Sequence, residues 1–164
     1  MNVLVTGGTG FVGSHTAKAL KRAGHHVRVL ARSEPKAESV FKAIDVDVDE
    51  IMVGDVTDPV AVARAIKGCD AVIHSAAMVS TADKHAEEMR EINVGGTKLV
   101  IDGCLAAGIK KIIYVSSVSA LFNAGDAVMN EDTPVSVAKS PYARTKVECE
   151  HYVRELQARG ASII

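Results

Sequence analysis

The sequence has no marked excess of charge of either sign. Its 164 residues carry 19 basic and 20 acidic side chains, which gives a net charge of −1 at pH 7. No net field therefore attracts the chain to nucleic acid or to an anionic membrane, and we expect neither as a partner. The composition, 48% hydrophobic and only 4% aromatic, excludes a disordered tail or a collagen-like fibre and is ordinary for a soluble globular protein.

Cysteines and long apolar runs are also scarce. Cys69, Cys104 and Cys149 form no CxxC pair and are odd in number, which argues against a disulfide framework and favours reduced thiols in the cytoplasm. The uncharged stretch from Ile112 to Gly125 is too short to span a bilayer. Residues 1–17 are uncharged as well, but they lack a basic region and are interrupted by glycines, so they do not predict a signal peptide.

Short apolar runs alternate with segments of helical length along the whole chain. Strands are predicted at Val3–Thr6, His26–Ala31, Ile51–Val53, Ala71–Ser75 and Ile112–Ser116. Helices are predicted at Phe11–Ala23, Glu34–Ile44 and Pro59–Ile66, within Asp83–Ala107, and at Lys139–Arg159. Most of the strands are β-branched and unbroken, as in parallel sheets covered on both faces. The alternation predicts an α/β protein with a doubly wound parallel sheet in three αβα layers.

The chain has the length of one domain, residues 1–164, and shows no repeat or linker. Its one long loop is predicted at Asn123–Ser136, where the turn residues are Gly125, Asp126, Asn130 and Pro134. Ala161–Ile164 then begins what we predict to be a sixth strand, inside which the chain stops. A terminal carboxylate in a buried strand is costly, so we expect the natural polypeptide to continue.

The first strand leads directly into a glycine-rich turn, Thr6-Gly7-Gly8-Thr9-Gly10-Phe11-Val12-Gly13. The turn contains GxGxxG at Gly8, Gly10 and Gly13, and GxxGxxG at Gly7, Gly10 and Gly13. Glycines at these spacings allow a tight turn and bring backbone amides close to a pyrophosphate at the helix N-terminus. A lone GxGxxG is a weak signal, but a strand before it and a helix after it are the context of a dinucleotide site. The sequence therefore predicts a Rossmann-type dinucleotide-binding fold.

The end of the second strand indicates which dinucleotide binds. NAD sites usually carry Asp or Glu at this point to bind the ribose 2′-hydroxyl, whereas this strand ends in Arg32-Ser33. An arginine suits a 2′-phosphate, with Ser33 as a second donor and Lys36 within reach. NADP is therefore the favoured cofactor. NAD is the alternative if Arg32 is only a solvated surface charge.

Other polar residues lie at the ends of later strands. Asp55 could accept a hydrogen bond from an adenine amino group, although by itself it would be interpreted as a turn residue. Asp58 is expected to cap the helix that Pro59 begins. The 6 histidines show no metal-ligand spacing, so no metal site is predicted. His74 is expected at the cofactor-facing end of the fourth strand.

A tyrosine and a lysine near the C-terminus have the spacing of an acid–base pair. Tyr142 and Lys146 are four residues apart, on one face of a predicted helix. A nearby ammonium stabilises a phenolate and lowers the phenol pKa from its usual value of about 10. The fifth strand ends in Ser116-Ser117, and the carboxyl ends of parallel strands line the ligand crevice. A serine there can donate a hydrogen bond to a substrate oxygen, and Ser119 is a further candidate.

These motifs occur together in the order found in extended short-chain dehydrogenases/reductases. The motifs are the TGGTGFVG turn, GDVTD, HSAA at 74–77, NVGGT at 93–97, YVSS and YARTK. Over nearly its whole length the chain resembles the N-terminal half of the NAD-dependent epimerase/dehydratase group. The Arg32 pattern is similar to the dihydroflavonol-reductase-like branch. Phe122 stands where many nucleotide-sugar enzymes of the group have a tyrosine, which weakens a nucleotide-sugar assignment.

The resemblance implies a role for each matched residue. Tyr142 would be the catalytic acid or base, Lys146 would bind the nicotinamide ribose and tune Tyr142, and Ser117 would orient the substrate oxygen. Asn93 would support the site. The predicted dinucleotide-binding residues are Gly7, Gly10, Phe11, Val12, Gly13, Arg32, Ser33, Asp55, Val56, Ser75, Ala76, Ala77, Asn93 and Lys146.

We therefore predict an NAD(P)-dependent oxidoreductase that transfers a hydride on a carbonyl/alcohol substrate. One alternative is a nucleotide-sugar epimerase or dehydratase with tightly bound NAD. The other is a non-catalytic NADP-binding regulatory module. The family's substrate-binding lobe comes mostly from sequence after the sixth strand, so we expect residues 1–164 alone to be inactive. The expected partner is the small-molecule substrate, with a homodimer left open.

Overall fold

The computed structural model describes residues 1–123, 128–130 and 132–164. Its centre is a sheet of five parallel strands in the order β3-β2-β1-β4-β5. The strands are β1 Asn2–Thr6, β2 His26–Ala31, β3 Glu50–Val53, β4 Ala71–His74 and β5 Ile112–Tyr114. The order reverses between β1 and β4, and this point is where an open parallel sheet leaves a crevice at the carboxyl ends of its strands. The predicted doubly wound parallel sheet is confirmed.

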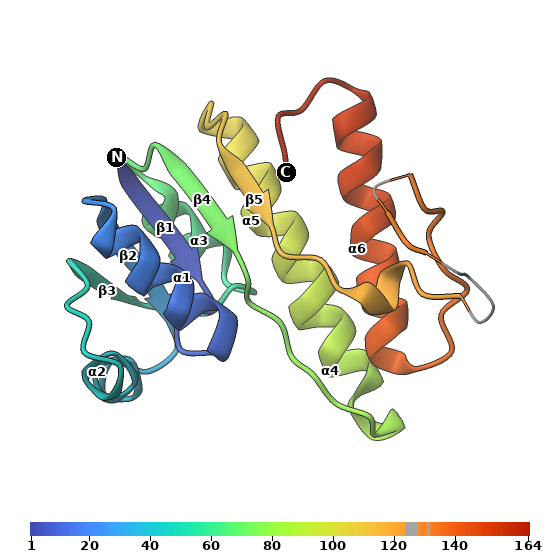
Figure 1. Cartoon of the computed structure of the whole chain (residues 1–164), viewed down its shortest axis with the longest axis horizontal. Helices are drawn as coiled ribbons and strands as arrows, with labels where there is room; N and C mark the ends of the chain where they lie inside the picture. The colour runs from blue at the N-terminus through green and yellow to red at the C-terminus, as the bar shows by residue number, and fades with distance from the viewer. Residues whose placement is uncertain (124–127, 131) are drawn as a thin grey trace.

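Helices connect the strands and cover both faces of the sheet (Figure 1). They are α1 Phe11–Arg22, α2 Glu34–Ala43, α3 Pro59–Ile66, α4 Ala86–Arg90, α5 Gly96–Ala106 and α6 Pro141–Ala158. Side chains that cap helix N-termini set several of these boundaries. Asp58 accepts a 2.8 Å hydrogen bond from the Val60 amide at the start of α3, which confirms the predicted cap. Ser140 caps α6 in the same way through the Ala143 amide, at 3.2 Å.

Alternate residues of β1 point into different parts of the core. Leu4 packs in a cluster that extends through α3, α5 and α6. Val5 packs on the opposite face with residues of α1 and α2, among them Ala17 and Phe41. Because side chains alternate along a strand, this division shows that β1 is covered on both faces. The three-layer arrangement predicted from the sequence is therefore correct.

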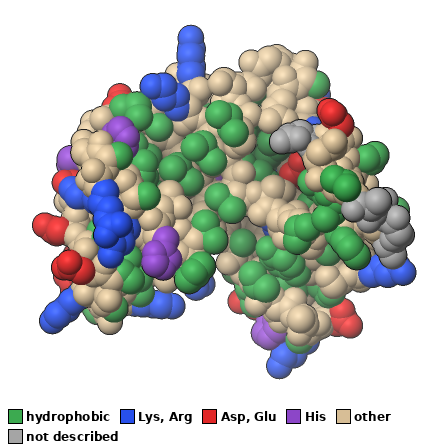
Figure 2. All heavy atoms as spheres, viewed as in Figure 1, with side chains coloured by type: hydrophobic (Ala, Val, Ile, Leu, Met, Phe, Trp, Pro, Cys, Tyr) green, Lys and Arg blue, Asp and Glu red, His purple; other side chains and the backbone are tan. Residues whose placement is uncertain are grey.

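The sheet is not covered evenly at its outer strands. Ile113 of β5 is 40% exposed and Val53 of β3 is 51% exposed, so the expectation of strands buried on both faces is wrong at these two positions. The reason is position in the sheet, because β3 is an edge strand and one face of β5 has no helix over it (Figure 1). Hydrophobic side chains are visible on this face of the molecule (Figure 2).

The long helix predicted within Asp83–Ala107 is interrupted. A 3-10 turn at Asp83–His85 precedes α4, and a π-helical segment, Glu91–Gly95, separates α4 from α5. Single π-helical turns of this kind occur often at functional sites, and this one contains Asn93. None of the helices in the described ranges is long and apolar enough to cross a membrane.

The end of the chain runs beside β5. Ile163 forms a parallel bridge with Ile112, and the Tyr114 amide donates a 2.7 Å hydrogen bond to the Ile164 carbonyl. The predicted sixth strand is therefore present as a single bridge next to β5. In the predicted loop, Asn130 accepts from the Thr133 amide at 3.1 Å, as in a turn, whereas Gly125 and Asp126 lie outside the described residues.

Candidate functional site

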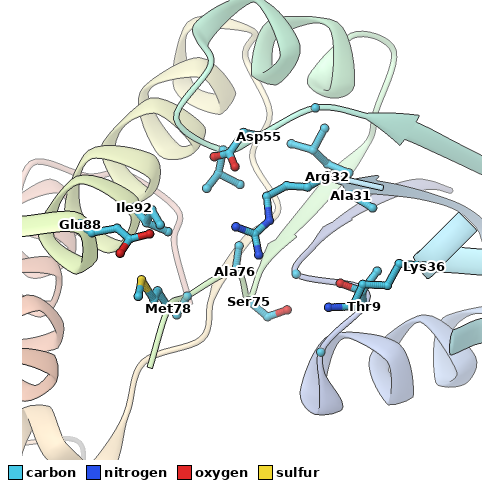
Figure 3. A pocket seen from close by; sticks show the side chains of 16 residues that line it. Thr9, Ala31, Arg32, Lys36, Asp55, Ser75, Ala76, Met78, Glu88 and Ile92 are labelled. Atoms are coloured by element: carbon cyan, nitrogen blue, oxygen red, sulfur yellow. The ribbon is translucent and has the colours of Figure 1, made fainter. Parts of the chain in front are cut away.

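A cavity of about 380 Å³ opens at the carboxyl ends of the central strands (Figure 3). The surface is hollowed between the α1 side and the α4 side of the molecule (Figure 2). The cavity is lined by these predicted dinucleotide-binding residues: Gly7, Gly10, Arg32, Asp55, Val56, Ser75, Ala76 and Ala77. The structure thus brings together residues from four separate segments of the sequence at the point where the strand order reverses.

The glycine turn after β1 is packed so closely that side chains do not fit. Gly7 has φ +70°, and a Cβ on it would lie 2.7 Å from the Ala76 amide nitrogen. A Cβ on Gly13 would lie 2.3 Å from the Gly7 carbonyl oxygen. The Gly10 amide donates to that same oxygen at 2.9 Å. The glycines therefore let the turn fold back against both α1 and the segment that follows β4.

The N-terminus of α1 faces outward beside this turn. The helix begins at Phe11, with Gly10 as its N-cap and no side chain that caps it. The first amides of such a helix have no partner within the helix and carry partial positive charge. Phe11 and Val12 are exposed, at 82% and 50%, and with Gly13 they do not line the cavity. Any contact these residues make with a ligand would therefore involve backbone amides or the exposed surface of α1.

Two cationic side chains stand at one end of the cavity. Arg32 and Lys36 are exposed, line the cavity and form no ion pair with other described residues. The Arg32 guanidinium extends across the mouth of the cavity toward the segment of Ser75 and Ala76 (Figure 3). Ser33 does not line the cavity; its hydroxyl accepts from the Lys36 amide at 3.4 Å as the N-cap of α2. Its O–H remains able to donate to a ligand.

Asp55 is held in place by its neighbour in the loop after β3. Its Oδ1 accepts from the backbone amide and from the hydroxyl of Thr57, both at 2.9 Å. The carboxylate is half-buried and lines the cavity. Both of these bonds use the same oxygen, so the second oxygen is available to accept a hydrogen bond from a ligand.

Lys146 is buried where α6 meets the end of β5. The residue is 4% exposed, and its Nζ donates a 2.8 Å hydrogen bond to the Val115 carbonyl. Burial lowers the pKa of this ammonium. Tyr142 lies one turn earlier on α6 and is half-buried. The predicted shared helix face is confirmed, and no hydrogen bond joins the Tyr142 hydroxyl to Lys146 within the described part of the chain.

The two serines after β5 have different surroundings. Ser116 donates a 2.6 Å hydrogen bond to Glu150 Oε2, and Glu150 Oε1 accepts from Arg154 at 2.9 Å. The Ser117 hydroxyl lies 2.9 Å from that of Ser119 and accepts from the Ser119 amide at 3.3 Å. Ser116 is therefore engaged with a carboxylate, while Ser117 keeps a hydroxyl whose partner can be exchanged. Ser117, Tyr142 and Lys146 lie outside the cavity lining.

Asn93 connects the segment after β4 with α6. Its Oδ1 accepts from the Met78 amide at 2.7 Å, and its Nδ2 donates to the Met78 carbonyl at 2.9 Å and to Thr145 Oγ1 at 3.0 Å. The side chain is 2% exposed. Thr145 directly precedes Lys146, so this one amide links the cavity wall to the helix that carries Lys146. The predicted supporting position of Asn93 agrees with this geometry, and its contact with a cofactor stays a prediction.

His74 was expected at the cofactor-facing end of β4, but its side chain does not reach the cavity. The ring is 1% exposed and lies between Thr6 Oγ1, 2.7 Å from Nδ1, and Thr97 Oγ1, 2.9 Å from Nε2. Burial first, and then the Lys146 charge, lower the pKa of His74 to about 3. His74 therefore connects β1, β4 and α5 as a neutral ring. The position of His74 in its strand does not predict these two hydrogen bonds, because Thr6 and Thr97 are distant from it in the sequence.

Sequence comparison finds the same family along the chain. The family model "NAD dependent epimerase/dehydratase family" matches residues 3–164. Sterol demethylase protein B of Methylococcus capsulatus is 32% identical over 99% of the chain and 49% of its own length. UDP-glucose 4-epimerase of Neisseria meningitidis is 32% identical over 95% of the chain and 48% of its own length. 2-Alkyl-3-oxoalkanoate reductase of Stenotrophomonas maltophilia is 35% identical over 99% of the chain and 48% of its own length. The chain thus spans about half the length of these curated relatives.

Solved structures with the same fold contain a bound dinucleotide. One is a short-chain dehydrogenase/reductase superfamily protein from Agrobacterium tumefaciens with bound NAD, which is 30% identical and has a TM-score of 0.84. The match covers 99% of this chain and 47% of that protein's chain. Another is UDP-glucose 4-epimerase from Bifidobacterium longum in complex with NAD⁺ and UDP, which is 28% identical and has a TM-score of 0.83. The match covers 97% of this chain and 50% of the epimerase chain. The sheet and helices described above are therefore also found in these two NAD-bound structures.

Proposed function

The chain belongs to the NAD-dependent epimerase/dehydratase family of extended short-chain dehydrogenases/reductases, and from this premise we propose that residues 1–164 form the dinucleotide-binding unit of an oxidoreductase. The reaction we propose is hydride transfer on a carbonyl/alcohol substrate. The observation that carries the proposal is the cavity at the carboxyl ends of β1, β2 and β4, which combines a glycine-rich turn with two cationic side chains. A region beyond these residues would then supply much of the substrate pocket, which is in keeping with the half-length match to the relatives.

The residues present fit a dinucleotide. A Cβ on Gly7 or Gly13 would lie within 3 Å of the chain's own backbone atoms, so glycine at these positions keeps the turn tight enough to bring its amides close to a pyrophosphate. The uncapped start of α1 offers amides for a pyrophosphate. Asp55 offers a carboxylate oxygen to the adenine amino group, and Arg32 offers a planar cation to the ribose 2′ position.

The cofactor we propose is NADP or NAD. The comparison structures contain NAD, whereas Arg32 and Lys36 favour a 2′-phosphate by charge-assisted hydrogen bonds. The Ser33 O–H is a further donor at the same place. We therefore propose that the chain binds both dinucleotides and prefers NADP.

Three side chains would carry the chemistry. When bound, the nicotinamide would accept or deliver the hydride. The Ser117 hydroxyl would donate a hydrogen bond to the substrate oxygen, and Tyr142 would give that oxygen a proton in reduction or take one in oxidation. Lys146 would stabilise the negative charge that develops on the Tyr142 oxygen, and would donate to the nicotinamide ribose. The burial of Lys146 beside the Val115 carbonyl supports this role, because it holds the ammonium next to the serine pair.

A nucleotide-sugar epimerase is the second candidate function. It is favoured by the relatives and comparison structures that carry that name, and it would use the same three side chains. Phe122 is 58% exposed near the serine pair and has no hydroxyl to offer a sugar substrate. For this reason we place a simple reductase or dehydrogenase first.

Dinucleotide titration tests the proposal directly. NADPH and NADH are titrated into the 164-residue chain, and binding is followed by the fluorescence of the reduced nicotinamide. We expect both to bind, NADPH more tightly, and Arg32→Ala to reduce that preference at least about tenfold, because a charge-assisted hydrogen bond is worth about 1.5–3 kcal/mol. Arg22→Ala, an exposed arginine at the end of α1, is the matched control and should leave both affinities unchanged. Absence of binding for both dinucleotides would refute the proposed function.

A further inference from the structure

The Lys146 ammonium is buried with few groups to stabilise its charge. Its only hydrogen bond within the described ranges is the one to the Val115 carbonyl, 2.8 Å long, and it takes part in none of the ion pairs found there. A buried ammonium without compensation tends to lose its proton, and burial lowers the pKa of this one. The other groups that face Nζ therefore decide whether it stays charged.

The aromatic ring of Tyr114 is one such group. Nζ lies 4.4 Å from the centre of the ring, well inside the distance of about 6 Å at which a ring face attracts a cation. Tyr114 is 7% exposed, and its ring stacks on that of His74 with 6.1 Å between the centres. The Tyr114 ring is therefore buried in the core and in contact with a side chain of β4.

The hydroxyl of Tyr114 has no comparable role. It is buried and has no hydrogen-bond partner among the described residues, and burial raises the pKa of this phenol, so it stays protonated. An unpaired buried hydroxyl costs free energy. The contribution of Tyr114 at this position therefore comes from its ring.

We propose that Tyr114 is a positioning residue for Lys146, whose ring face holds the ammonium at the end of β5 and keeps it charged. The proposal deepens the proposed function and rests on it for the role of Lys146 itself. It adds one requirement, that the position two residues before Ser116 be aromatic. It also states that phenylalanine would serve as well as tyrosine there.

The remaining titratable groups around Lys146 do not replace the ring. His74, on β4, is neutral because burial lowers its pKa to about 3. Cys149, on α6, is a thiol whose pKa burial raises. The Glu150 carboxylate acts on the ammonium through its charge and raises the Lys146 pKa, but its oxygens form hydrogen bonds to Ser116 and Arg154 and not to Nζ. Tyr142 lies one turn before Lys146 on the same helix.

The test measures the pKa of Lys146 directly. The protein is labelled with ¹³C at lysine Cε, the Lys146 signal is assigned by its loss in Lys146→Met, and the signal is followed through a pH titration. In Tyr114→Phe we expect a pKa within about 0.3 unit of the wild type, because the ring face is kept. In Tyr114→Leu and Tyr114→Met we expect it to fall by about one unit, because the charged form loses the ring.

The direction of the shift separates this role from simple packing. If the ring only fills space, its loss admits water to the ammonium and the pKa rises toward its ordinary value. The Met variant has a flexible side chain that adapts to irregular core space and guards against misfolding of the Leu variant, and amide spectra verify the fold of each. Tyr152→Leu is the matched control, since that half-buried ring lies between α6 and α5, with Lys98 of α5 5.5 Å from its centre, and it should leave the Lys146 pKa unchanged.

Each outcome bears on a single proposal. An unchanged or raised pKa in both ringless variants, or a fall in Tyr114→Phe as large as in Tyr114→Leu, overturns the role of the ring. NADPH titration of the same samples tests the function separately. If the pKa falls as expected while even the wild type binds no dinucleotide, the inference about Tyr114 stands and the proposed function fails.

Discussion

Asn93 offers the most direct test of how the site is held together. Replacing it with alanine removes three hydrogen bonds from a side chain that is 2% exposed. The Met78 amide and carbonyl then both lose their partner, and Thr145 Oγ1 loses a donor while keeping its own bond to the Tyr142 carbonyl at 2.7 Å. The substitution thus cuts the connection between the segment after β4 and the first turn of α6.

The expected loss of stability follows from these contacts. A buried polar group that loses its partner costs about 1–3 kcal/mol, and Met78 is only half-buried, so water can satisfy part of its backbone. We therefore expect Asn93→Ala to lower the free energy of unfolding by about 2–4 kcal/mol. For a chain of this length, each kcal/mol lowers Tm by about 2–4 °C.

Urea denaturation followed by circular dichroism measures the change, and deuterium exchange at the Met78 amide reports where it acts. The matched control is Asn2→Ala, an exposed asparagine whose amide makes one 3.3 Å bond to the Gly68 carbonyl, and there we expect a change within about 0.5 kcal/mol. If Asn93→Ala costs no more than Asn2→Ala, or if exchange at Met78 does not increase, the linking role of Asn93 is wrong.

Three further predictions concern the turn, the buried histidine and the proposed acid. Gly13→Ala should weaken NADPH binding at least about tenfold, because the new Cβ would lie 2.3 Å from the Gly7 carbonyl oxygen. Gly95→Ala is the control, since a Cβ there has no atom within 4 Å, and it should bind NADPH normally in the same titration. Equal NADPH affinities of the two variants would contradict the close packing of the turn. His74 has a pKa of about 3 in the folded chain and about 6.5 in the unfolded chain. Between these values only the unfolded chain takes up a proton at this ring. The free energy of unfolding therefore falls by up to about 1.4 kcal/mol for each unit that the pH is lowered below about 6.5. Urea titrations at pH 7 and pH 5 should show that loss in the wild type and a smaller one in His74→Gln, and an equal loss in both would mean that His74 is not the group responsible. In a full-length protein, Tyr142→Phe should leave NADPH affinity unchanged and lower turnover by about 10² or more, and near-normal turnover would favour the non-catalytic binding module.

The sequence by itself determined the fold and the place of the glycine-rich turn after β1. Unbroken β-branched runs separated by helical segments are typical of a parallel sheet with helices on both faces, and the glycines that follow β1 identify the tight turn, where a Cβ on Gly7 or Gly13 would clash with backbone. Caps such as Asp58 are local, since they bond an amide two residues away. Such features depend on neighbours along the chain, and a reader of the sequence can find them.

The tertiary structure decided what lies around the side chains that we propose carry the chemistry. Tyr142 and Lys146 have a readable spacing, but the burial of Lys146 against Val115 and Tyr114 depends on how α6 packs on β5. The same holds for His74, which sits at the expected strand end and yet faces Thr6 and Thr97 instead of the cavity. Hydrogen bonds and ring contacts between residues tens of positions apart leave no periodic signal, because each forms only once the sheet has brought its strands together.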